Sequence, residues 1–126
     1  MARVIVADDN LLARTLLRQI LERAGHEVVG EAENGESVIG LAADERPDLV
    51  LLDICMPRRD GLSALRHLLL REPSLRVVMC SASATESRVV EALRLGARDF
   101  IVKPIETSRV LAAVERALGT SLAVAA

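Results

Sequence analysis

Short apolar runs alternate along this chain with longer segments in which apolar residues recur every three or four positions. A run of four to six aliphatic residues indicates a buried strand, whereas the longer spacing indicates an amphipathic helix. Strict alternation of the two predicts a parallel α/β domain, because a parallel strand pair is joined by a crossover helix. The expected strands cover residues 4–7, 28–32, 49–52, 77–80 and 99–103.

Five helices are expected after these strands, and small polar residues, glycines and prolines mark their ends. Asn10 is a suitable N-cap for the first helix, and Gly96 is a suitable C-cap for the fourth. The expected helices lie between residues 10 and 25, 35 and 46, 62 and 70, 85 and 96, and 106 and 118.

Length and composition suit one domain, with a core over about residues 3–118 and a short C-terminal tail to residue 126. The core must be aliphatic, because Phe100 is the only aromatic residue. A net charge of −2 gives no overall attraction to nucleic acid or to an anionic membrane, so neither is an expected partner. Two cysteines and no apolar stretch long enough for a signal or a membrane span indicate a reduced cytoplasmic protein.

Four of the apolar runs end at polar residues. Asp8 and Asp9 follow the first run and Asp53 the third, while Ser81 follows the fourth and Lys103, the only lysine, ends the last. Parallel strands place their carboxyl ends at one edge of the sheet, where ligands bind. We therefore expect three carboxylates, a hydroxyl and an ammonium group to meet there, which are the groups of a metal-assisted phosphoryl site.

Each of these groups has a chemical role and a plainer alternative. The carboxylates of Asp8, Asp9 and Asp53 are hard donors that suit Mg²⁺, and Asp53 could also carry a covalent phosphoryl group. Ser81 and Lys103 could bind phosphoryl oxygens. Taken singly, the acids could only favour a helix start or a turn, and Ser81 could be a loop residue. Three like charges on one edge favour a metal, because they would otherwise repel one another.

Other chemistry has little support. His26 and His67 have no cysteine or carboxylate at ligand spacing and are interpreted as surface residues. The chain contains neither GxGxxG nor GxxxxGK[ST], so it has no recognisable cradle for a nucleotide. A phosphoryl donor must therefore be another molecule.

Residues 53–61 (DICMPRRDG), with Asp8-Asp9 before them and Lys103-Pro104 after them, closely resemble the receiver domains of two-component response regulators. The resemblance covers about residues 3–118, and residues 96–104 are similar to stand-alone chemotaxis regulators of the CheY type. It implies a flavodoxin-like (βα)5 fold, with a doubly wound five-stranded parallel sheet in the strand order 2-1-3-4-5.

The resemblance implies that a histidine kinase transfers a phosphoryl group to Asp53. It implies Mg²⁺ as the cofactor, held by Asp9, Asp53 and the backbone carbonyl of Cys55, with Asp8 assisting through water. The protein would catalyse only its own phosphotransfer and autodephosphorylation, and would not otherwise be an enzyme. Cys55 and Ser83 stand where side chains tune hydrolysis, and neither can orient water well, so a moderately long phosphorylated lifetime is expected.

The resemblance also implies a switch. Ser81 and Lys103 would bind the phosphoryl oxygens, and movement of the Ser81 hydroxyl would free space for the aromatic ring of Phe100 to turn inward. Phe100 lacks the hydroxyl of the tyrosine that is frequent at this position, so the inward state should be populated easily. The peptide bond before Pro104 is expected to be cis.

Output would pass through the last two helices and the strand between them to a protein target, with the flagellar motor switch as one candidate. The protein would be a monomer or a phosphorylation-dependent dimer. The side chains expected to be exposed on this face are Arg88, Glu91, Arg98, Ile105 and Arg109.

Three alternatives stay open. The chain could be a receiver domain from a longer DNA-binding or enzymatic regulator. It could be a haloacid dehalogenase-type hydrolase, but that class needs an aspartate where Cys55 stands and a cap insertion that this chain lacks. It could also be a receiver that acts without phosphorylation, although every charged group that the reaction requires is present.

Overall fold

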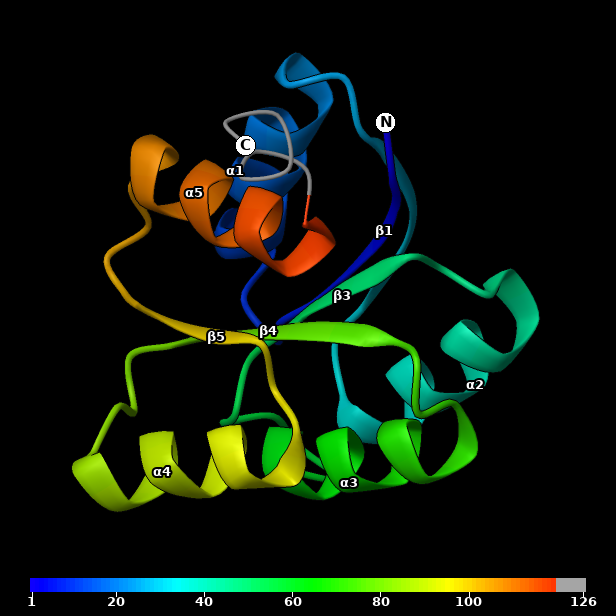
Figure 1. The fold of residues 1–126 in the computed structure, drawn as a ribbon, viewed down its shortest axis with the longest axis vertical. Helices are drawn as coiled ribbons and strands as arrows, with labels where there is room; N and C mark the ends of the chain where they lie inside the picture. The colour runs from blue at the N-terminus through cyan, green and yellow to red at the C-terminus, as the bar shows by residue number, and fades with distance from the viewer. Residues whose placement is uncertain (120–126) are drawn as a thin grey trace.

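Five parallel strands form one sheet in the computed structural model, which describes residues 1–119 (Figure 1). The strand order is β2-β1-β3-β4-β5, so the predicted fold class and strand order are confirmed. The tail predicted to follow residue 118 lies almost wholly outside the described residues. The elements are β1 (Arg3–Ala7), α1 (Leu11–Arg23), β2 (Glu27–Ala32), α2 (Gly35–Glu45), β3 (Leu49–Leu52), α3 (Gly61–Arg71), β4 (Arg76–Ser81), α4 (Glu86–Leu95), β5 (Asp99–Val102) and α5 (Thr107–Leu118).

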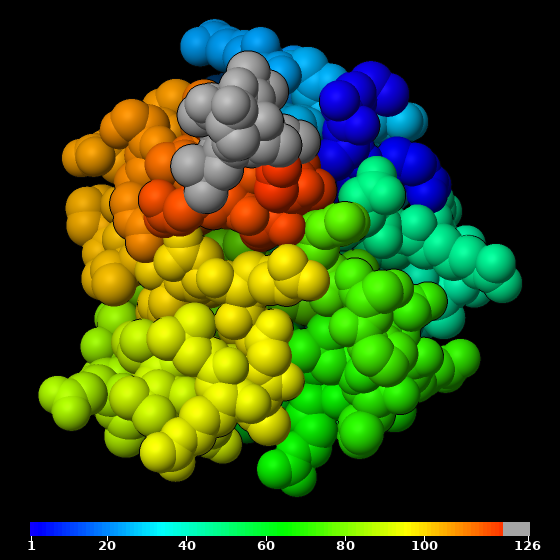
Figure 2. Space-filling view, in the orientation of Figure 1, coloured from blue at the N-terminus to red at the C-terminus, as the bar shows by residue number. Residues whose placement is uncertain are grey.

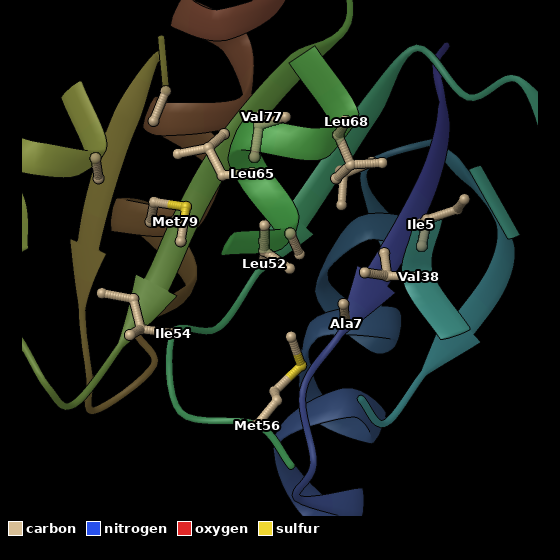
Figure 3. Packing of buried hydrophobic residues seen from close by; sticks show 14 of the residues in the cluster. Ile5, Ala7, Val38, Leu52, Ile54, Met56, Leu65, Leu68, Val77 and Met79 are labelled. Carbon is tan, nitrogen blue, oxygen red and sulfur yellow. The ribbon is translucent and has the colours of Figure 1, made fainter. Parts of the chain in front are cut away.

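Helices cover both faces of the sheet, with α1 and α5 on one face and α2, α3 and α4 on the other (Figure 1). Alternate residues of each strand therefore enter two separate cores: in β1, Ile5 faces α2 and Val6 faces α1. Figure 3 shows the first of these cores, in which Leu52 and Met79 from neighbouring strands pack near Leu65 of α3. Burial on both faces explains why residues 4–7, 49–52 and 77–80 of the central strands are all apolar.

The ends of several helices lie where the sequence predicts them. The side chain of Asn10 accepts a hydrogen bond from the backbone N–H of Ala13 at 2.9 Å, which confirms it as the N-cap of α1. Gly96 ends α4 with a φ of 116°, in the left-handed region that glycine adopts without strain. Several boundaries differ by about one residue: β4, for example, includes Ser81, and α5 begins at Thr107 with Glu106 as its N-cap.

The loop between β3 and α3 lies very close to its neighbours. A Cβ atom added to Gly61 would lie 1.9 Å from the carbonyl oxygen of Asp53, and one added to Gly35 would lie 2.0 Å from that of Arg59. The backbone N–H of Gly61 also donates to the carbonyl of Ile54 at 2.7 Å. Contact through these two glycines therefore holds the residues that follow β3 in place.

The histidines are less exposed than expected. His26 is half-buried and its Nδ1 accepts a hydrogen bond from the backbone N–H of Ala2 at 3.1 Å, and burial lowers the pKa of the ring. His67 is half-buried as well. Both residues keep part of their surface toward solvent, and His26 is in addition engaged by the backbone of Ala2. Within residues 1–119, no helix combines the length and the apolar character needed to cross a membrane.

Replacing Gly61 with alanine should destabilise the protein, because the added methyl group would meet backbone atoms that cannot move independently. We expect Gly61→Ala to lower the free energy of unfolding by about 2 kcal/mol or more. Gly40→Ala is the matched control, since a Cβ at Gly40 in α2 would meet nothing within 4 Å. It should raise the free energy of unfolding by about 0.5–1 kcal/mol. Urea denaturation followed by circular dichroism measures both, and equal effects would contradict the steric argument.

Candidate functional site

Three aspartates meet at the carboxyl ends of β1 and β3. Asp8 and Asp9 follow β1 and Asp53 follows β3, and these two strands are neighbours in the sheet. One carboxylate oxygen from each aspartate lies within 4.8 Å of the other two. The residues Asp8 and Asp53 are only 1% and 5% exposed, whereas Asp9 is exposed. The structure thus brings together the three carboxylates that the sequence singled out.

Lys103 reaches this cluster from the end of β5. Its Nζ lies 2.6 Å from Oδ2 of Asp8 and 3.2 Å from Oδ2 of Asp53, and 19% of its side chain is exposed. The backbone N–H of Lys103 donates to the carbonyl of Ser81 at 3.1 Å, which fixes the backbone position from which the lysine side chain extends to the carboxylates. One ammonium group therefore faces three carboxylates, and two formal negative charges are left unbalanced.

Burial changes the proton affinity of this cluster. It raises the pKa of Asp8, because hydrogen bonds from Lys103 and from the backbone of Asn10 only partly offset the loss of hydration. Burial alone would lower the pKa of Lys103, but its hydrogen bond to Asp8 and the charge of Asp53 outweigh that effect and raise it. Lys103 therefore stays protonated, and the excess negative charge stays on the carboxylates.

The donor set fits a small divalent cation. Mg²⁺ binds through one or two carboxylates together with waters and phosphate oxygens, and two unbalanced negative charges match its charge. Cys55 lies in the same loop as Asp53, and its backbone N–H is 3.4 Å from Oδ1 of Asp53. The individual ligand roles of Asp8, Asp9, Asp53 and the Cys55 carbonyl stay predictions.

The remaining polar strand end, Ser81, also lies at this edge, where its carbonyl accepts from the backbone N–H of Lys103. Ser81 is 1% exposed, and its Oγ accepts a hydrogen bond from the backbone N–H of Ser83 at 3.1 Å. Since that bond uses an oxygen lone pair, the hydroxyl proton is left to donate to another acceptor. Within residues 1–119, no hydrogen bond joins the Ser81 side chain to Asp53 or Lys103.

Phe100 lies in the core between the sheet and α3 and α4, where it is 7% exposed. The ease with which the ring turns inward, and its movement on phosphorylation, stay predictions. The Lys103-Pro104 peptide bond is cis, as expected.

Arg14 contacts the site, although the sequence pattern did not single it out. Its Nη1 donates to the backbone carbonyl of Asp8 at 2.8 Å, and its Nε donates to Glu31 of β2 at 3.0 Å. The only sequence signal is an arginine in the first turns of the helix that follows the two aspartates. Nothing in the sequence places β2 beside that helix closely enough to supply Glu31.

Residues 4–115 match the family described as the response regulator receiver domain. The chain belongs to this family. Phosphorylation and the use of Mg²⁺ at an acidic cluster are general features of the family, and the acidic cluster is present here.

Relatives of known name cover nearly the whole chain. "Protein CcdB" of Bacillus subtilis is 47% identical over 94% of this chain and 99% of its own length. "Chemotaxis protein CheY" of Listeria monocytogenes is 44% identical over 93% of this chain and 98% of its own length. CheY from the Borrelia burgdorferi CheX-CheY-BeF3-Mg complex superposes with a TM-score of 0.89 at 33% identity, covering 90% of this chain and 87% of that one.

Neutralising Asp8 should stabilise the protein at neutral pH when Mg²⁺ is absent. Because the pKa of Asp8 is raised on folding from about 3.8, its contribution to stability is lost as the pH rises from that value through the folded-state pKa. We expect Asp8→Asn to have a higher free energy of unfolding than wild type at pH 7, and the difference to disappear near pH 3.8. Asp44→Asn, at an exposed position of α2, is the control for removal of a surface charge and should change the free energy of unfolding by less than about 0.5 kcal/mol.

Urea denaturation at several pH values, with and without Mg²⁺, measures this effect. Added Mg²⁺ should stabilise wild type more than Asp8→Asn, because a ligand stabilises the state that binds it. An Asp8→Asn protein that is less stable than wild type at pH 7 without Mg²⁺ would show that the hydrogen bond to Lys103 outweighs the cost of burial.

Proposed function

We propose that this chain is a phosphorylation-activated receiver that accepts a phosphoryl group from a histidine kinase on Asp53 in the presence of Mg²⁺. One observation carries the proposal: the buried Asp53 carboxylate lies 3.2 Å from the ammonium of Lys103 and beside the carboxylates of Asp8 and Asp9. Such a site combines a nucleophile, a fixed positive charge and room for a divalent cation. Family membership supports this interpretation.

In the proposed reaction, a carboxylate oxygen of Asp53 attacks the phosphorus of a phosphohistidine. The O–P bond forms as the N–P bond breaks, and the nitrogen of the donor histidine leaves with the bonding electron pair. Mg²⁺, when bound by the acidic residues, supplies positive charge that offsets the charge on the phosphoryl oxygens. Lys103 contributes a second positive charge to the same oxygens, and Ser81 has a hydroxyl proton available to donate.

The backbone keeps the nucleophile in place during this reaction. The N–H of Asp53 donates to the carbonyl of Ala7 at 3.0 Å, which continues the pairing of β1 and β3 past their ends. Gly61 packs directly on the Asp53 carbonyl. The loop side chains at Cys55 and Ser83 carry neither a carboxamide nor a carboxylate to orient water, so the acyl phosphate should outlast a few seconds. Beyond this phosphotransfer and the hydrolysis of the acyl phosphate, which returns the Asp53 carboxylate and releases inorganic phosphate, we propose no enzymatic activity.

The proposed output surface consists of α4, β5 and α5, whose surfaces lie on the same side of the molecule (Figure 2). Val90, Leu93 and Val102 are exposed apolar side chains on this surface, at 40%, 47% and 53%. Exposed apolar residues gathered on one face suit a protein partner. The similarity to chemotaxis proteins supports a target in chemotaxis. We further propose the flagellar motor switch as a candidate target, and action in the cytoplasm as a monomer or a phosphorylation-dependent dimer.

Three side chains on this surface, those of Arg88, Ile105 and Arg109, are less exposed than expected. Glu91 and Arg98 are exposed as expected, but Arg88 is half-buried. Arg109 donates to Asp99 at 3.3 Å and to the carbonyl of Phe100 at 3.0 Å, so it is largely engaged within the protein. Ile105 is likewise half-buried, because it packs against the core on the side of the sheet that α1 and α5 cover.

Acetyl phosphate provides a direct test of the proposed function. With Mg²⁺, the wild-type protein should gain one phosphoryl group, measured by intact mass, and the gain should require the metal. Asp53→Asn should gain none, whereas Asp60→Asn, which alters only the cap of α3 in the same loop, should label like wild type. No gain in the folded wild-type protein would count against the proposal, as would labelling of Asp53→Asn to the wild-type level.

A further inference from the structure

Asp9 is the acidic residue whose position most needs an explanation. It is exposed, and within residues 1–119 no hydrogen bond reaches its carboxylate. Asp8, by contrast, is held by Lys103 and by the backbone N–H of Asn10. The direction of the Asp9 side chain must therefore be set by its backbone, which begins with the peptide that joins Asp8 to Asp9.

Arg14 holds that peptide. The carbonyl oxygen of Asp8 belongs to the Asp8-Asp9 peptide plane, and Nη1 of Arg14 donates to it at 2.8 Å. Because a peptide unit is planar, fixing this oxygen also fixes the direction of the N–H and Cα of Asp9. On the other side of Asp8, its own N–H donates to the carbonyl of Ala32 at 2.9 Å. Both peptides that flank Asp8 are thus restrained.

Arg14 is itself restrained by Glu31. Its side chain is 12% exposed and pairs with Glu31 at 3.0 Å, and the second oxygen of Glu31 pairs with Arg18 at 2.7 Å. Burial alone would raise the pKa of Glu31, but hydrogen bonds from Arg18 and Arg14 lower it, so this carboxylate stays ionised. The planar fork of a guanidinium can bond the Asp8 carbonyl and Glu31 at once, which the single ammonium of a lysine does less well.

The charge of Arg14 and its geometry act in opposite directions on a metal site. A positive charge close to the acidic cluster repels Mg²⁺, so removal of the charge alone would strengthen metal binding. Loss of the hydrogen bond to Asp8 would release the Asp8-Asp9 peptide and weaken binding. Arg14→Lys separates the two effects, because it keeps the charge and removes the fork.

We propose that Arg14, anchored by Glu31, is a positioning residue that orients Asp9 for Mg²⁺ through the Asp8-Asp9 peptide. This inference rests on the proposed function. Residues that orient a metal ligand without touching the metal typically change metal affinity by about ten- to a hundredfold. For a contact through one backbone carbonyl, we expect the lower end of that range.

Mg²⁺ affinity should be measured by calorimetry and by the amide NMR signal of Asp9, because the chain has no tryptophan or tyrosine to report binding by fluorescence. We expect Arg14→Lys to weaken binding by about tenfold. Arg18→Gln is the matched control, because Arg18 lies in the same helix and pairs with the same Glu31 but does not contact Asp8. It should bind Mg²⁺ within about twofold of wild type, since screened surface pairs contribute little.

The outcomes separate the two proposals. Arg14→Lys with wild-type affinity, together with Arg14→Gln that binds Mg²⁺ more tightly, would show that only charge matters and would overturn the inference. Equal weakening in Arg18→Gln would also overturn it. If Arg14→Lys does not fold, Glu31→Gln removes the anchor instead and should weaken binding severalfold for the same reason. Wild-type protein that binds no Mg²⁺ would count against the proposed function itself.

Discussion

One ammonium group faces three carboxylates at the carboxyl edge of this sheet, and the site depends on that unequal balance. Lys103 contacts Asp8 and Asp53 at 2.6 and 3.2 Å, where little water is available to screen the charges. Loss of the lysine would leave these buried carboxylates without a compensating charge, which typically costs about 3–5 kcal/mol. Lys103 does not neutralise them, and the remaining charge suits a divalent cation and a phosphoryl group together.

Backbone contacts give this electrostatic arrangement its geometry. The Asp53 carbonyl is fixed by Gly61, and the peptide after Asp8 is fixed by Arg14. Neither contact involves a reacting atom. Precise placement at the site therefore comes from a close approach that only glycine permits and from a guanidinium that joins α1 to the ends of β1 and β2. Neither Gly61 nor Arg14 is among the carboxylate, hydroxyl and ammonium groups of the predicted site.

Much of the fold could be predicted because local rules and tertiary structure agree. The runs that became β1 and β3 are apolar at each position since both of their faces are covered, and Asn10 and Gly96 mark helix ends by chemistry that acts within one turn. Predictions failed where a side chain meets a distant part of the chain. Arg109 of α5 bonds to Asp99 and Phe100 of β5, and Arg14 of α1 bonds to Glu31 of β2.

By itself, the sequence determined the five-stranded parallel architecture and the shared edge for Asp8, Asp9, Asp53, Ser81 and Lys103, because apolar periodicity and strand direction are encoded locally. Only the tertiary structure decided how these groups are held. The reach of Lys103 to Asp8 spans 95 residues of chain, and the fork of Arg14 depends on the register of β2. Such contacts follow from how elements pack against one another, and no pattern along the chain specifies them.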